Sequence, residues 1–271
     1  MIVEHLVFSG GGARGLAYAA AYSELCASCT VRLRSLVGTS IGALVCALLS
    51  VGYTGQELEA MVTDLNLSDL TNISLMSVFS AWGLDDGSRL EKFVDDRLCE
   101  KTGDRAMTMK DLPVRATFVA TNLNAAEAVY FSPDSHPDVR VSFAVRASMA
   151  LPPLFAPVRY NNVALLVDGG LCDNFPIEQA PDPTTTVGFQ LHWNNAFELS
   201  SIDTFFSRVV YVGLYRLSQA KTNRTAARVV SIDGGNVATL NMRVPDAVKQ
   251  SLFASARSAV RGAVKAWEEK Q

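Results

Sequence analysis

Gly38-Thr39-Ser40-Ile41-Gly42 is the segment from which the architecture of this chain can be predicted first. An alternating apolar run, residues 31–37, precedes it, and a run of small apolar residues, 43–51, follows it. This order predicts a strand, a sharp turn and a helix, and a Gly-x-Ser-x-Gly turn in that setting is typical of a nucleophile elbow. The serine hydroxyl then lies at a helix start, where amides favour developing negative charge. The bare pattern also fits an ordinary glycine-rich turn with a capping serine.

A glycine-rich loop lies upstream of this turn, between the first predicted strand and an alanine-rich helical segment. The strand is residues 2–8, the loop is Ser9-Gly10-Gly11-Gly12-Ala13-Arg14-Gly15, and the helical segment is residues 16–27. Such a loop turns a row of backbone N–H groups toward an anion, and its arginine adds a positive charge. Two uses compete at this point: a cradle for phosphate, or an oxyanion hole for a tetrahedral acyl intermediate.

The same loop matches the dinucleotide-binding fingerprint, as Gly10-x-Gly12-x-x-Gly15. That interpretation also needs an acidic residue about 20 positions further on, at the end of the second strand. The second predicted strand contains Arg32 and Arg34, lacks an acid, and ends in the Ser40 turn. The hydrolase interpretation is therefore favoured over the dinucleotide one, and close helix–strand packing is the simplest alternative use of the glycines.

A second candidate catalytic position follows the short apolar strand predicted at residues 163–167. The strand ends in Asp168-Gly169-Gly170, and an aspartate at a strand end is well placed for a site, although Asp-Gly pairs also make ordinary turns. The three histidines are candidates for a triad. His5 falls inside the first strand and His136 in a proline-flanked loop, so His192, at the end of the strand 185–191, is the best of them.

The remaining chain reads as alternating helices and strands. A capping box at Thr54 and Glu57 begins a helix. Further helices are predicted at residues 88–100, 139–150, 202–220 and 245–269, and further strands at 114–121, 129–131 and 229–233. Residues 68–84 are irregular and carry apolar side chains, among them Leu70, Phe79 and Trp82, which suit either a loop folded onto the core or a lid over an acyl-chain entrance.

Composition bounds the classes of function. The chain has 271 residues, of which 49% are hydrophobic and 19% charged, with a net charge of −3, so we expect no nucleic-acid partner. No transmembrane helix or signal peptide is recognised, and a cytoplasmic location is expected. An odd number of cysteines predicts reduced thiols, and Cys26-x-x-Cys29 lacks a second pair, so neither a metal nor a cofactor is expected; the five are Cys26, Cys29, Cys46, Cys99 and Cys172.

Three motifs now stand in a defined order: Gly10-Gly11-Gly12-Ala13-Arg14-Gly15, Gly38-Thr39-Ser40-Ile41-Gly42 and Asp168-Gly169-Gly170. Together they resemble the signature of the patatin-like phospholipase family. Residues 146–155 and 171–176 resemble the family's segments on either side of the aspartate, and the resemblance covers about residues 3–192. It implies a three-layer α/β/α fold with a central, mostly parallel sheet. We expect one domain over residues 1–271, with 193–271 as a carboxyl-terminal extension packed on the rest.

The resemblance also implies the chemistry. Ser40 is expected to be the nucleophile and Asp168 the base of a catalytic dyad, and the amides of Gly11 and Gly12, supported by Gly10 and Arg14, to form the oxyanion hole. The expected reaction is hydrolysis of an acyl ester in a phospholipid or related lipid through an acyl-enzyme, with peripheral membrane contact.

The alternative is a non-catalytic lipid- or acyl-binding protein of the same fold. The family also includes injected effectors, so action in another cell is an alternative location, and the sequence indicates no oligomeric state. Aspartate has an ordinary pKa of about 3.9, so it can act as the base only where burial raises its basicity.

Overall fold

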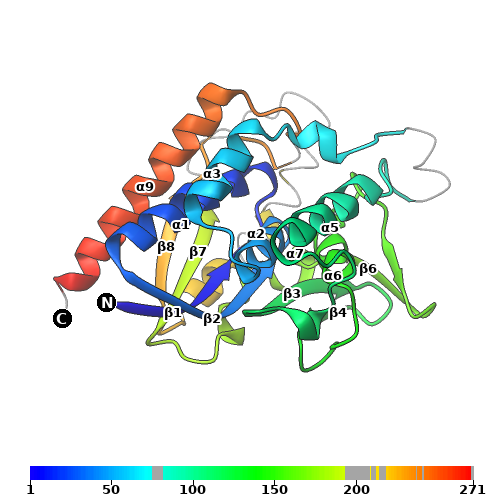
Figure 1. Cartoon of the computed structure of the whole chain (residues 1–271), viewed down its shortest axis with the longest axis horizontal. Coiled ribbons are helices and arrows are strands. Elements are labelled where there is room, and N and C mark those ends of the chain that lie inside the picture. Colours follow the sequence, from blue (N-terminus) through cyan, green and yellow to red (C-terminus); the bar gives the residue numbers. More distant parts are fainter. Residues whose placement is uncertain are drawn as a thin grey trace.

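The computed structural model describes residues 1–74, 82–192, 208, 212–213, 218–235, 237–239 and 241–269. Within these residues eight strands form one sheet, in the order β5-β6-β3-β2-β1-β7-β8, with β4 also paired to β3 (Figure 1). The strands are β1 (Ile2–Phe8), β2 (Thr30–Thr39), β3 (Arg115–Asn122), β4 (Glu127–Phe131), β5 (Val158–Tyr160), β6 (Ala164–Asp168), β7 (Thr186–His192) and β8 (Arg228–Asp233).

The sheet divides into a parallel half and an antiparallel half. Strands β3, β2, β1, β7 and β8 pair in parallel, whereas β4 and β6 run antiparallel to β3, and β5 runs antiparallel to β6. Strand β1 lies between β2 and β7, as its continuous apolar sequence predicts for a strand covered on both faces. The predicted α/β class with a largely parallel sheet is confirmed.

The helices follow the strands as the sequence periodicity indicates. They are α1 (Ala17–Ser28), α2 (Ile41–Ser50), α3 (Gly55–Asp64), α5 (Ser88–Thr102), α6 (Val141–Ser148), α7 (Gly170–Asp173) and α9 (Asp246–Glu268), with the 3-10 turns η1 (Gly12–Leu16), η2 (Leu67–Leu70), η3 (Met109–Asp111) and η4 (Ile177–Gln179). Helix α2 is buried along its whole length. Helix α3 begins with the predicted capping box of Thr54 and Glu57.

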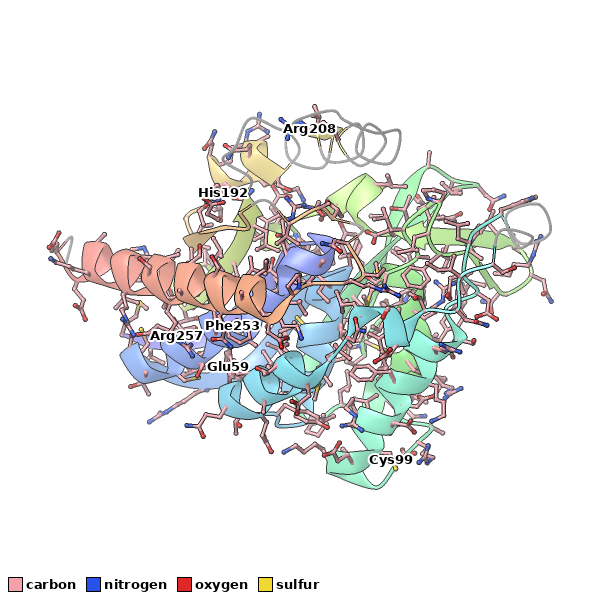
Figure 2. The ribbon with its side chains drawn as sticks, turned by 90° about the horizontal axis from the view of Figure 1, so that it is seen from above. Glu59, Cys99, His192, Arg208, Phe253 and Arg257 are labelled. Atoms are coloured by element: carbon pink, nitrogen blue, oxygen red, sulfur yellow. The ribbon has the colours of Figure 1, made fainter. Side chains whose placement is uncertain are left out.

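The long helix α9 runs along α1 and β8 on one side of the sheet (Figure 1). Arg257 of α9 forms a two-point ion pair with Glu59 of α3, with Nη1 3.0 Å from Oε1, and the two labelled side chains face each other in Figure 2. Arg261 pairs in the same way with Glu24 of α1. The charged edge of α9 is therefore joined to two different helices.

The opposite face of the sheet is covered by the segment that follows α7. Val7 and Val37 of the two central strands pack there against Phe175 and Ile177, and all four side chains are buried. This segment carries the residues that continue from the aspartate motif. The position of that motif is thus fixed by packing on the back of the sheet.

Several sequence predictions need correction. Strand β5 was not predicted, and neither was the short helix α7, Gly170–Asp173, which follows the aspartate. Helix α6 is shorter than the predicted 139–150 because the chain turns at Met149. Most of the predicted helix 202–220 lies outside the described residues.

The irregular segment 68–84 contains both buried and exposed apolar side chains among its described residues. Leu70 is buried, as a loop folded onto the core requires, whereas Ile73 and Trp82 are 54% and 61% exposed. The segment is anchored by two backbone hydrogen bonds, from Ser74 to Leu84 and from Leu84 to Pro153. Residues 75–81, which include Phe79 of the proposed lid, lie outside the described part. None of the helices within the described ranges is long and apolar enough to span a membrane.

Candidate active site

Ser40 stands at the sharp turn between β2 and α2. Its φ is +55°, a value that residues with side chains rarely adopt. A Cβ atom on Gly38 would lie 2.4 Å from the Gly42 carbonyl oxygen, and one on Gly42 would lie 2.4 Å from the Phe8 carbonyl oxygen. Only glycine fits at either position, so the turn has the geometry of the predicted elbow.

The Ser40 hydroxyl donates a 2.6 Å hydrogen bond to Oδ2 of Asp168, 128 residues later in the sequence. Asp168 ends β6, where it pairs with Ala120 of β3, and the adjacent residue Val119 pairs with Thr39 of β2. The antiparallel strand β6 therefore brings its end to the tip of a parallel strand. The sequence anticipated the strand end but not its direction.

The environment of Asp168 makes it more basic than an ordinary aspartate. The side chain is 2% exposed, and burial raises the pKa of its carboxyl from 3.8 to about 6. The hydrogen bonds from the Ser40 hydroxyl and the Gly170 amide oppose this rise, because they stabilise the carboxylate. The Gly170 amide donates to Oδ1 at 2.8 Å, which leaves Oδ2 directed at Ser40.

Ser148, near the end of α6, connects the two motifs. Its hydroxyl accepts the backbone N–H of Ser40 at 2.9 Å, and its carbonyl accepts the N–H of Gly169 at 3.3 Å. Because Ser148 is completely buried, water does not compete for these bonds. The Ser40 amide is consequently occupied and is not a donor for an incoming oxyanion.

The glycine loop faces the same site. The Gly10 amide donates to the Asn174 carbonyl at 3.0 Å, so this residue holds the loop in place rather than offering a donor. For the amides of Gly11 and Gly12, no hydrogen bond to another described residue is present. These two amides are therefore the loop donors left for a ligand.

Thr239, far along the chain, supports the loop from outside. The Ala13 amide donates to its carbonyl at 3.1 Å. Gly12 has a φ of +58°, and a Cβ there would lie 2.1 Å from the same carbonyl oxygen. The buried Arg14 donates from Nε to the Gly11 carbonyl at 3.2 Å and from Nη2 to the Thr239 hydroxyl at 2.9 Å. Arg14 thus braces the loop that carries the two unoccupied amides.

All six residues predicted for the site line one small cavity of about 20 Å³: Gly10, Gly11, Gly12, Arg14, Ser40 and Asp168. This volume holds about one or two water-sized groups, so it suits a single reacting carbonyl and not a dinucleotide. An adjoining apolar cavity of about 50 Å³ shares Gly12 and Ser40 with it, and its other walls include Leu70, Leu90 and Phe155. The arrangement offers a polar position for an ester and an apolar position beside it.

Sequence reasoning missed the five other residues that line this cavity: Leu151, Asn174, Leu191, Ser218 and Thr239. Asn174 belongs to the segment 171–176, which was noted for its resemblance but given no role. Leu191 lies on β7, and a Cβ on Gly11 would lie 2.4 Å from it. Nothing in the sequence around Thr239 marks it as part of a site, because its contacts with the loop exist only in the folded chain.

None of the three histidines, all of which the structure describes, is hydrogen-bonded to Ser40 or Asp168. His5 Nδ1 lies 2.7 Å from the Ser35 hydroxyl. His192, which is labelled in Figure 2, has its Nδ1 2.9 Å from the Ser231 hydroxyl. A histidine triad is therefore absent from this arrangement.

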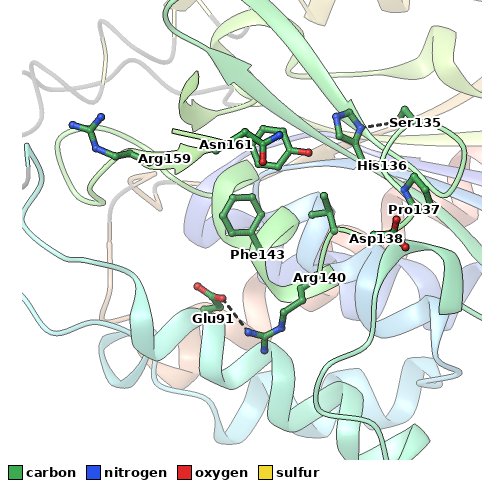
Figure 3. Close-up of a pocket in the computed structure, with 11 residues that line it drawn as sticks. Glu91, Ser135, His136, Pro137, Asp138, Arg140, Phe143, Arg159 and Asn161 are labelled. Atoms are coloured by element: carbon green, nitrogen blue, oxygen red, sulfur yellow. Dashed lines mark hydrogen bonds and ion pairs between the residues drawn. The ribbon is translucent and has the colours of Figure 1, made fainter. Parts of the chain in front are cut away.

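His136 lies in the wall of a separate open cavity of about 630 Å³ (Figure 3). Its Nδ1 is 2.8 Å from the Ser135 hydroxyl, and Glu91 and Arg140 form an ion pair across the same cavity at 3.9 Å. Of the residues predicted for the site, none lines this cavity. This open cavity is thus distinct from the one that contains the serine–aspartate pair.

Comparisons with known proteins identify relatives of this chain and solved structures of a similar fold. A sequence model described as patatin-like phospholipase matches residues 6–181. The uncharacterized protein R571 of Acanthamoeba polyphaga mimivirus is 26% identical over 224 residues, which cover 78% of this chain and 75% of that protein. The probable lipid hydrolase 463L of Invertebrate iridescent virus 6 is 28% identical over 184 residues, which cover 65% of this chain and 62% of the viral protein. The crystal structure of VipD from Legionella pneumophila superposes with a TM-score of 0.72 at 16% identity, over 97% of this chain and 67% of VipD.

Proposed function

The chain belongs to the patatin-like phospholipase family, and from this premise we propose that it hydrolyses carboxylic esters of phospholipids or related lipids, with Ser40 as nucleophile and Asp168 as base. The observation that carries the proposal is the 2.6 Å hydrogen bond between Ser40 Oγ and Asp168 Oδ2, in a small cavity that adjoins an apolar one.

The first half of the reaction forms an acyl-enzyme. Ser40 Oγ attacks the ester carbonyl carbon while its proton passes to Asp168 Oδ2. With a pKa of about 6, Asp168 is ionised at neutral pH yet more basic than an exposed aspartate. The amides of Gly11 and Gly12 donate to the oxyanion of the tetrahedral intermediate, which collapses and releases the alcohol portion with the proton from Asp168.

The second half restores the enzyme. A water molecule gives a proton to Asp168 and attacks the acyl carbon, and the same two amides stabilise the second oxyanion. Collapse breaks the bond to Ser40, whose oxygen recovers the proton held by Asp168. One base therefore serves both steps, and the net reaction is ester plus water to acid plus alcohol.

The surroundings of the site support a lipid as the substrate. The apolar cavity beside Ser40 gives an acyl chain a place next to the reacting carbonyl. Thr71 lines that cavity, and Ile73, two residues later in the sequence, is 54% exposed. Trp82, on the same anchored segment, is 61% exposed. We propose that these side chains make the peripheral contact with a lipid surface.

The test is hydrolysis of a short-chain nitrophenyl ester and of a fluorogenic phospholipid. We expect Ser40→Ala and Asp168→Asn to lower kcat by roughly 10⁴-fold or more, as removal of a triad member does in other serine hydrolases. Ser50→Ala, a buried serine on the same helix, and Asp138→Asn, an exposed aspartate, are the matched controls and should keep full activity. Equal turnover by the parent protein and Ser40→Ala would refute the proposal.

Labelling by a fluorophosphonate separates this proposal from a non-catalytic lipid-binding role. The reagent reacts with an activated serine, so the parent protein should be labelled and Ser40→Ala should not. A folded parent protein that neither reacts nor hydrolyses either ester would instead favour the binding role.

A further inference from the structure

The apolar cavity beside Ser40 is bounded, among other residues, by Ile41 of α2 and Leu67 of η2. Its volume of about 50 Å³ holds about four groups of the size of a water molecule or a methylene, at about 10–15 Å³ for each. An acyl chain that starts at the carbonyl carbon near Ser40 and Gly12 has this cavity beside it, and the lining of the cavity is almost entirely apolar. The cavity therefore accommodates only the first few carbons of a chain.

A second apolar cavity of about 40 Å³ lies beyond the first. It is enclosed by helices α1, α2, α3 and α5, through side chains such as Ala19, Val45, Leu58 and Phe93. Its volume holds about three further methylene-sized groups by the same measure. No polar group of the described residues is exposed in its wall, so it suits hydrocarbon and not an ester or a head group.

Ile41 and Leu67 line both cavities and stand between them. Ile41 is the first residue of α2 and is 6% exposed, and a Cβ on Gly15 would lie 2.4 Å from its side chain, so it is held firmly. Leu67 begins the short turn η2 and is 9% exposed. A short turn can shift more easily than the buried start of a helix, which makes Leu67 the movable half of the wall.

We propose that Ile41 and Leu67 form a chain-length wall, which limits the acyl group accepted at Ser40 to about four to six carbons unless Leu67 moves. This inference rests on the proposed function, because it assigns the acyl position of the same site. It names the chain length as the property by which the protein selects among esters.

The physical basis is the burial of hydrocarbon. Each methylene that leaves water for an apolar cavity raises kcat/KM about fourfold, which corresponds to about 0.8 kcal/mol. The gain should continue while carbons fill the first cavity and stop where the chain meets the wall. Beyond that point further carbons stay in water or force Leu67 aside.

The experiment measures kcat/KM for nitrophenyl esters from butanoyl to dodecanoyl, each below its micelle concentration. For the parent protein we expect a maximum near six carbons. Leu67→Ala joins the two cavities and should move the maximum by about three carbons, with the decanoyl-to-butanoyl ratio raised at least tenfold. Leu98→Ala, a buried leucine of α5 that lines neither cavity, is the matched control and should keep the parent profile.

A second variant identifies the path of the chain. Val45 lines only the second cavity, so Val45→Phe should fill that space. Combined with Leu67→Ala, it should return the maximum to near six carbons. Leu67→Val, a milder change, should give a smaller shift in the same direction, and it serves if Leu67→Ala does not fold.

An unchanged profile in both Leu67 variants, or an equal shift in Leu98→Ala, would overturn the wall. If the parent protein hydrolyses no ester, the proposed function fails separately. The wall is then tested by thermal stabilisation with free fatty acids. Hexanoate should stabilise the parent protein most and decanoate the Leu67→Ala protein most, and identical rank orders would overturn the inference.

Discussion

Ser40 occupies a backbone conformation that costs stability. A residue other than glycine at a φ of +55° is strained by about 1–3 kcal/mol, and the strain persists because Gly38 and Gly42 leave the turn no other close-packed arrangement. Ser148 holds the Ser40 amide in this position. The strain and the hydrogen bond together aim the hydroxyl at Asp168, so the geometry of the pair is set before any substrate arrives.

Asp168 should make the folded protein less stable above pH 6 than it would be with a neutral side chain. Its folded pKa of about 6 lies above its ordinary value of 3.8, so the folded state binds this proton more tightly than the unfolded chain. The stability that the folded state gains by binding this proton more tightly is fully present below pH 4 and is lost as the pH rises through 6. We expect Asp168→Asn to raise the melting temperature at pH 8 and to raise the free energy of unfolding by up to about 3 kcal/mol.

Thermal unfolding between pH 4 and pH 8 measures this effect. The advantage of Asp168→Asn should shrink as the pH falls from 6 to 4, because the Asp168 carboxyl of the folded parent protein becomes protonated over this range. An advantage for Asp168→Asn that is constant over this range would show that burial does not raise its pKa.

Ser148 should act on turnover through Ser40. Ser148→Ala removes the acceptor of a buried N–H, a loss of about 1–3 kcal/mol, and the elbow should relax. We expect kcat for ester hydrolysis to fall roughly 5- to 150-fold with KM little changed.

Ser142→Ala is the control for this change, since Ser142 lies on the same helix, is buried, and its hydroxyl has no hydrogen-bond partner among the described residues. Equal losses of kcat in the two variants would assign the effect to the helix and not to the bond to Ser40.

At the scale of elements, helix α3 depends on α9 for its ending. Lys249 of α9 is 5% exposed, and its ammonium donates to the carbonyls of Thr63 and Leu65 at 2.8 and 3.0 Å. These carbonyls belong to the end of α3, where a positive charge is favoured and where the helix itself supplies no partner. Two elements far apart in sequence thus share one cap.

Lys249→Met should therefore destabilise the protein by about 1–3 kcal/mol, because two carbonyls lose a charged donor. The measurement is the midpoint of urea unfolding. Lys265→Met, an exposed lysine on the same helix, should change the midpoint little. If both variants unfold at the same urea concentration, the cap contributes nothing measurable.

The elements show which parts of the fold could be predicted from the sequence. Strand β1, helix α2 and the capping box of α3 were predicted because their signals are local: apolar runs, glycines and a spaced Thr–Glu pair. The direction of β6 was not, because the sequence of a strand does not state which neighbour it pairs with. Three residues of β5 are too few for a periodic pattern.

At the scale of the whole molecule, some residues of the site could be predicted from the sequence and others could not. Ser40, Asp168 and the glycine loop stand in recognisable motifs, and the fold brings all of them to one cavity. Asn174 and Thr239 hold the glycine loop through backbone carbonyls, which any residue type can supply, and Thr239 also accepts a hydrogen bond from Arg14 through its hydroxyl. Such contacts leave little trace in a sequence, and neither do the volumes of cavities, which result from packing between several helices.

The support that Thr239 gives to the glycine loop has a consequence for the modularity of this protein. The three motifs fall within the matched residues 6–181. The carbonyl that accepts a hydrogen bond from the loop belongs to Thr239, which follows β7 and β8 in the sequence. A shortened chain with every motif intact would lack part of the frame around its own oxyanion donors. The segment that carries the motifs therefore does not contain the whole site. Recombination or truncation at its borders would separate the glycine loop from Thr239, which supports it.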